Sequence, residues 1–164
     1  MVDFHSVYER HASDVHAFAM YLSGDRATAE DLVAEAFVRL WTARGEIRTA
    51  TIKAYLFAIV RNLYLTSRRR APRLVPLDDT HTPVDRAASI DAQFEHREEL
   101  ARVRAALAEL PEIDRTALLL RAEHDLPYDE IARVLQISLS AAKVKVHRAR
   151  LRLAAATTPE KVSS

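Results

Sequence analysis

Apolar residues recur in this sequence at the spacing of an amphipathic helix, and this pattern limits the fold more than any other feature. The first stripe runs through residues 4–22, and comparable stripes occupy residues 28–41 and 52–70. We expect the second helix to begin at Thr28. Recurrence at three and four residues is typical of helices that bury one face. Only 2 glycines and 6 prolines occur among the 164 residues, so few positions interrupt a helix. The sequence therefore predicts an all-α fold.

The helical pattern stops in one long segment, residues 71–88, which reads APRLVPLDDTHTPVDRAA. This segment holds three prolines and several acids and has no helical period. Such a composition is typical of a linker. We therefore expect two small helical domains, residues 1–70 and 89–156, joined by this proline-containing linker and followed by a tail at residues 157–164.

Composition excludes several classes of protein. The chain has no cysteine, which excludes disulfides and thiolate metal sites. The first residues, MVDFHSVYERH, lack the charged and apolar blocks of a signal peptide, and no apolar run approaches the ~20 residues of a membrane span. We therefore expect a cytoplasmic protein.

The net charge of +1 hides an alternation between acidic and basic blocks. Residues 1–43 carry a net −4 and residues 74–127 a net −6, whereas residues 44–73 carry +7 and residues 128–164 carry +4. Two basic blocks separated by acidic ones suggest two surfaces that face phosphate groups. Charge alone leaves open the alternative of ordinary solvated helix surface.

The second basic block has the form of a helix-turn-helix. Residues 128–153 read YDEIARVLQISLSAAKVKVHRARLRL, a short helix, a tight turn and a basic second helix. At 100° per residue, the second helix buries a stripe formed by Ala142, Val146, Ala149 and Leu153. Its other face and its edges present Ser140, Lys143, Val144, Lys145, His147 and Arg148. No acid occurs between Gln136 and Glu160, so the major groove of DNA is a fitting partner for this helix.

Two stretches resemble a known family. Residues 106–153, ALAELPEIDRTALLLRAEHDLPYDEIARVLQISLSAAKVKVHRARLRL, resemble region four of the extracytoplasmic-function (ECF) sigma factors of the sigma-70 family. Residues 28–70, TAEDLVAEAFVRLWTARGEIRTATIKAYLFAIVRNLYLTSRRR, are similar to region two. The resemblance implies a non-catalytic factor that brings core RNA polymerase to promoter DNA and starts transcription. It also implies an anti-sigma factor as a partner.

The resemblance assigns roles to individual residues. Asp31 and Glu35, which are spaced i, i+4 on one helix face, match the surface that grips the polymerase. The positions that open and hold the minus-ten element are matched by Arg48, Lys53, Arg61, Asn62, Tyr64, Arg68, Arg69 and Arg70. These supply charge, amide donors and a stacking ring, which suit single-stranded DNA. The positions that reach the minus-thirty-five element are matched by Arg121, Ser140, Lys143, Val144, Lys145, His147 and Arg148.

The sequence departs from the family at several positions. Ala34 stands where Gln is usual, and Pro127 replaces a usual capping Ser, which weakens that helix start. Gln136 occupies a turn position that is commonly Gly, where a left-handed conformation costs about 1 kcal/mol. Val144 stands where Ser is frequent. The last departure predicts an altered promoter preference.

Two other functions compete with this one. A stand-alone helix-turn-helix regulator explains residues 90–155 but gives no reason for the basic block at 44–70. A metal-dependent enzyme would need clustered histidines, yet His5 and His16 are about 16 Å apart along a helix. No HExxH sequence, glycine-rich phosphate loop or nucleophile elbow occurs. We therefore expect no enzymatic activity, no metal, no cofactor and no small-molecule substrate.

Overall fold

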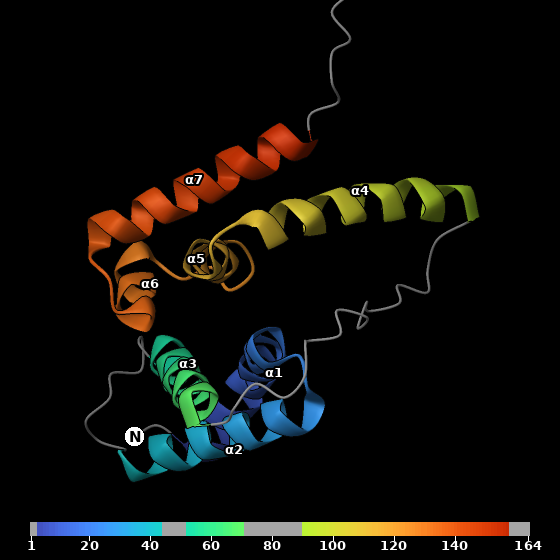
Figure 1. Cartoon of the computed structure of the whole chain (residues 1–164). Helices are drawn as coiled ribbons and strands as arrows, with labels where there is room; N and C mark the ends of the chain where they lie inside the picture. Colours follow the sequence, from blue (N-terminus) through green and yellow to red (C-terminus); the bar gives the residue numbers. More distant parts are fainter. Residues whose placement is uncertain (1–2, 44–51, 71–89, 158–164) are drawn as a thin grey trace, which may run out of the picture. The chain divides into compact units, whose positions relative to one another are not determined.

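The computed structural model describes residues 3–43, 52–70 and 90–157, and these residues form seven helices and no strand (Figure 1). The predicted all-α fold is thereby confirmed. The chain divides into two compact units, Met1–Thr82 and Pro83–Ser164, which are described separately below. The expected linker at 71–88 lies outside the described residues, and so does the expected tail at 157–164 except for Thr157, which is the last residue of α7.

The first unit is a bundle of α1 (Phe4–Ser23), α2 (Arg26–Thr42) and α3 (Ile52–Arg70), each of which packs against the other two (Figure 1). Its core is centred on two aromatic rings, those of Phe18 and Phe57, whose centroids lie 4.7 Å apart. Both side chains are completely buried. Most of the apolar stripe predicted for α1 is buried in this bundle, including Val7, Val15 and Phe18, whereas Tyr8 is exposed.

Local signals set the ends of these helices. The Asp3 side chain accepts a hydrogen bond from the His5 amide at the start of α1. Gly24 ends that helix in the left-handed conformation, at φ 67°, where glycine has no steric penalty. The α2 helix begins at Arg26, two residues before the start expected at Thr28, because Asp25 caps it by accepting from the Thr28 amide at 3.0 Å.

The second unit consists of α4 (Ile90–Glu109), α5 (Glu112–Ala122), α6 (Tyr128–Leu135) and α7 (Leu139–Thr157). The last helix packs against the other three (Figure 1). Helices α6 and α7 with the turn between them form the predicted helix-turn-helix. Of the stripe predicted on α7, Ala142, Val146 and Ala149 are fully buried, and Leu153 is half-buried.

Two departures from the family are visible in the backbone of this motif. Gln136 takes the left-handed conformation, with φ 57° and ψ 48°, although it carries a side chain. Pro127 precedes α6 and makes no side-chain capping hydrogen bond. The start of α6 therefore lacks the usual cap, whereas the Ser138 hydroxyl accepts from the Ala141 amide and supports the start of α7.

Candidate DNA and polymerase interface

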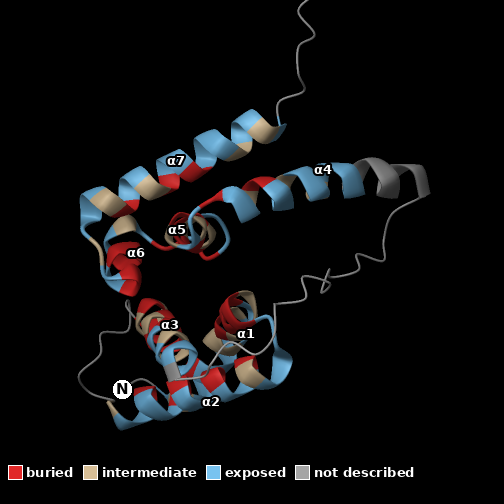
Figure 2. Ribbon diagram, viewed as in Figure 1, coloured by how far each residue is buried: buried red, intermediate tan, exposed pale blue. Residues whose placement is uncertain are grey.

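The outer face of α7 is polar and cationic, as the sequence predicts. Figure 2 shows this helix buried along one side and exposed along the other. The exposed residues include Ser140, Lys143, Val144, His147 and Arg148. Val144 retains 45% of its surface, so it does not fill the domain core. An exposed apolar side chain surrounded by cations is able to contact a thymine methyl while its neighbours contact phosphates.

Lys145 lies at the edge of this face and makes an internal contact. Its Nζ is 3.3 Å from Oδ1 of Asp114, in the first turn of α5. The Lys145 side chain is 23% exposed and that of Asp114 is 9% exposed. The pair therefore joins α5 to α7 with its anion inside the domain. Sequence spacing does not reveal it, because the two residues are 31 positions apart.

Arg121 on α5 was also assigned to the minus-thirty-five element. Like Lys145, it makes contacts within its own domain. Its guanidinium donates to the Leu126 carbonyl oxygen at 3.2 Å and lies over the Tyr128 ring at 5.0 Å. It is also 4.0 Å from the carboxylate of Asp125, which is exposed. Arg121 thus ties the end of α5 to the loop and first residue of α6.

Lys53 belongs to a small charged cluster between α1 and α3. Its Nζ is 3.2 Å from Oδ2 of Asp14 and 5.9 Å from the centre of the Phe57 ring. Burial, with Lys53 and Arg10 nearby, lowers the pKa of His11 below its ordinary value of 6.5, while Asp14 acts in the opposite direction. His11 is therefore mostly neutral at pH 7. The ion pair between Lys53 and Asp14 helps to hold α3 against α1.

The remaining residues assigned to the minus-ten element on α3 differ in exposure. Asn62, Arg68 and Arg69 are exposed, and Tyr64 is half-buried with the Arg68 guanidinium 5.8 Å from its ring centre. Arg61 is buried, at 8% exposure, so little of its side chain is available to DNA in this structure. Arg48 and the Arg70 side chain lie outside the described residues.

The candidate polymerase surface lies on α2. Asp31 and Glu35 are both exposed, and Glu35 pairs with Arg39 on the same helix at 3.2 Å. Val38 and Trp41 are also exposed, at 59% and 47%. Neither was among the site residues predicted from the sequence. Val38 follows Glu35 by three positions and Asp31 by seven, which is the signal that would have found it.

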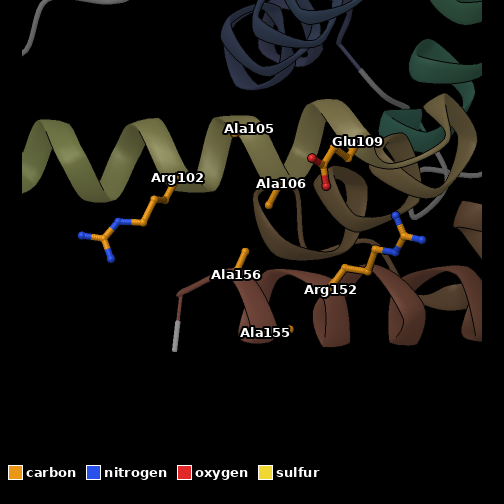
Figure 3. A pocket seen from close by; sticks show the side chains of 7 residues that line it. All are labelled: Arg102, Ala105, Ala106, Glu109, Arg152, Ala155 and Ala156. Atoms are coloured by element: carbon orange, nitrogen blue, oxygen red, sulfur yellow. The ribbon is translucent and has the colours of Figure 1, made fainter. Parts of the chain in front are cut away.

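A shallow groove separates the facing sides of α4 and α7 in the second unit (Figure 3). Its volume is about 590 Å³, and it is lined by Arg102, Ala105, Ala106, Glu109, Arg152, Ala155 and Ala156. None of these residues was among the site residues predicted from the sequence. Ala106 on α4 and Ala156 on α7 point toward each other, and Arg102 and Arg152 extend in opposite directions on either side of them (Figure 3).

Neither a metal centre nor a membrane span is found within the described ranges. No three His, Cys, Asp or Glu residues lie close enough there to hold a metal ion. None of the described helices is both long and apolar enough to cross a bilayer.

A helix-turn-helix with a cationic outer face defines the class of this protein as DNA-binding. Two family models match the chain, "Sigma-70 region 2" over residues 7–74 and "Sigma-70, region 4" over residues 100–153. The ECF RNA polymerase sigma factor EcfG of Rhodopseudomonas palustris (strain TIE-1) is 32% identical over 142 residues, which are 86% of this chain and 77% of the relative. The chain therefore belongs to the ECF RNA polymerase sigma factors, which direct core polymerase to specific promoters.

A second relative agrees with this membership, and a solved structure shows the same fold. The ECF sigma factor SigE of Mycolicibacterium smegmatis is 31% identical over 157 residues. The matching region covers 93% of this chain but 61% of the length of that relative. The solved structure of the sigma factor RpoE from Bartonella quintana, in complex with the anti-sigma factor NepR, has the same fold. Its TM-score is 0.73 at 24% identity, over 99% of each chain.

Family membership bears on the alternatives from the sequence. Sigma factors are non-catalytic initiation factors, which agrees with the expectation that polymerase supplies the chemistry. The stand-alone regulator explains only the second unit, whereas the two family models together match residues in both units.

Proposed function

We propose that this protein brings core RNA polymerase to promoters by contacting the polymerase with α2 and the minus-thirty-five element with α7. The observation that supports the second contact best is the outer face of α7, where cations surround the exposed Val144. Ser140, Lys143, Val144, His147 and Arg148 are the residues proposed to meet DNA. Arg121 and Lys145, assigned to the same element by resemblance, make internal contacts and are given another role below.

The proposed polymerase contact centres on Asp31 and Glu35. Both carboxylates are exposed, and the apolar surface of Val38 continues the same face of α2. A face that combines two acids with exposed apolar area suits a basic partner helix. Ala34 adds no hydrogen bond there, so these side chains would supply most of the affinity of this face.

The proposed minus-ten contact lies on α3 and the segment before it. Asn62 is exposed and offers an amide, and Tyr64 offers a partly exposed ring for base stacking. The exposed Arg68 and Arg69, together with Arg48 and Arg70, would supply cations for the DNA backbone, whereas Lys53 is paired with Asp14. Arg61 would contribute only if its buried side chain turned outward.

An anti-sigma factor is the further partner that we propose. The support is the Bartonella quintana structure, in which a sigma factor of the same fold is in complex with the anti-sigma factor NepR. Because the partners of this chain would be polymerase and chromosomal DNA, we place the site of action in the cytoplasm. This function requires neither a cofactor nor a small-molecule substrate.

The polymerase contact can be tested by charge reversal. The variant Asp31→Lys with Glu35→Lys should lose most of its binding in a pull-down of core polymerase, because two attractive charges become repulsive. Glu30→Lys is the matched control, since Glu30 is exposed on the same helix but points about 100° away from Asp31. Equal binding by the double variant and the control, with unchanged helical circular dichroism, would contradict the assignment.

A further inference from the structure

Asp114 is a buried carboxylate that neither the resemblance nor the charge pattern singled out. It lies in the first turn of α5, where the helix dipole favours a negative charge. Its Oδ1 lies 3.3 Å from Nζ of Lys145 on α7. A carboxylate in this environment needs a cation nearby, because burial of an isolated charge is costly.

A DNA phosphate is a second candidate partner for the Lys145 ammonium group. Lys145 is one helical turn from Arg148, which is exposed, and it directly follows Val144 on the proposed DNA face. The flexible side chain of a lysine at that edge could reach a DNA phosphate if it were released. One ammonium group cannot be held by Asp114 inside the domain and neutralise a phosphate outside it at full strength.

We propose that Asp114 is a positioning residue that holds Lys145 away from DNA and anchors the recognition helix α7 to α5. Lys145 then contributes to the placement of α7 and not to the phosphate contacts. This inference rests on the proposed function, since it assumes that α7 meets DNA. It assigns opposite roles to two neighbouring lysines of α7, because Lys143 is exposed and free to neutralise a phosphate.

The salt dependence of binding measures this difference directly. The logarithm of the binding constant falls with the logarithm of salt concentration, with a slope of about 0.9 for each phosphate neutralised. Binding of the intact chain to a duplex of unrelated sequence would be measured over a series of salt concentrations. Lys143→Met should lower this slope by about 0.9, whereas Lys145→Met, which keeps the aliphatic stem, should leave the slope unchanged.

Removal of the Asp114 carboxylate should strengthen DNA binding. Asp114→Ala frees the Lys145 side chain, so the slope should rise by about 0.9 and the duplex should bind several-fold more tightly at low salt. The double variant Asp114→Ala with Lys145→Met should return to the parent slope. Such a reversal shows that the gain depends on the Lys145 charge, which a purely structural effect of Asp114 would not produce.

The double variant also keeps the test informative if the single variants fail to fold. Each single variant leaves one charge without its partner, whereas the double variant removes both, which is often tolerated. Thermal melting followed by circular dichroism identifies the variants that are folded. If only the double variant is folded, a parent slope supports the proposal and a slope lower by about 0.9 overturns it.

Two results would overturn the proposal in distinguishable ways. If Lys145→Met lowers the slope as much as Lys143→Met does, Lys145 contacts phosphate directly and the inference fails, while the proposed function stands. If Lys143→Met and Arg148→Met both leave the slope unchanged, α7 does not meet the DNA backbone, and the proposed function fails together with the inference.

Discussion

The guanidinium of Arg121 lies over the ring of Tyr128 at 5.0 Å, and this contact links the last turn of α5 to the first residue of α6. The same guanidinium donates to the Leu126 carbonyl oxygen. Pro127 provides no side-chain cap for α6, so the contacts from Arg121 on α5 help to stabilise the start of that helix. The nearby Asp125 carboxylate is highly exposed, so it adds little to stability.

The first prediction follows from this contact. Tyr128→Leu removes the ring and should lower the free energy of unfolding of the second unit by about 1 kcal/mol, the usual strength of a partly buried cation–π contact. Chemical denaturation followed by circular dichroism would measure the loss. Tyr128→Phe keeps the ring and is the control, which should stay close to the parent. An equal loss in both variants would show that the hydroxyl matters and the ring does not.

The second prediction concerns promoter opening. Asn62→Ala and Tyr64→Ala should reduce transcription from duplex promoters and should be partly rescued on a template with a pre-melted bubble, because the proposed contacts form with the separated strand. Ser67→Ala, also at an exposed position of α3, should behave like the parent on both templates. Absence of rescue on the bubble template would remove the role in strand opening.

The third prediction concerns Val144. Because this side chain is 45% exposed, Val144→Ser should leave the melting temperature nearly unchanged. It should change base preference at one minus-thirty-five position by roughly 1 kcal/mol, the usual cost of one base contact. Selection from a randomised promoter library would measure the preference. Leu151→Ser, at an exposed apolar position two turns further along α7, is the control and should leave the preference unchanged.

The fourth prediction concerns the turn of the helix-turn-helix. Gln136 has φ 57°, so Gln136→Gly should relieve the steric cost of the left-handed conformation and stabilise the second unit by roughly 0.5 kcal/mol after the entropy of glycine is subtracted. Gln136→Ala retains the β-carbon and should give no such gain. Thermal denaturation of both variants would measure the difference, and a Gly variant less stable than the Ala variant would refute this explanation.

Much of the fold could be read from the sequence, because a helix is determined by residues within about four positions of one another. The buried stripe of α7 and the short α6 at Tyr128–Leu135 follow from such local patterns, whereas the left-handed turn at Gln136 was implied by the family resemblance. The predicted start of α2 was wrong by two residues because both Asp25 and Thr28 are good capping residues, and Asp25 takes the role.

Exposure on α7 was also largely predictable from the sequence. Val144 lies opposite the buried stripe by helical geometry alone, and the structure leaves it exposed. A residue near the centre of a helix face has the same environment in almost any packing. Residues at the boundary between the buried and exposed faces do not, because a small rotation of the helix moves them from one to the other.

The tertiary structure alone decided what those boundary residues do. Lys145 pairs with Asp114 and Lys53 pairs with Asp14, each across two different helices. Whether a cation at a helix edge meets solvent or a carboxylate depends on which helices pack together, and at what angle and register. The helical period carries none of that information. By itself the sequence thus determined the helices, their buried faces and the family, whereas only the packing decided which of the predicted DNA-binding cations are held inside the protein.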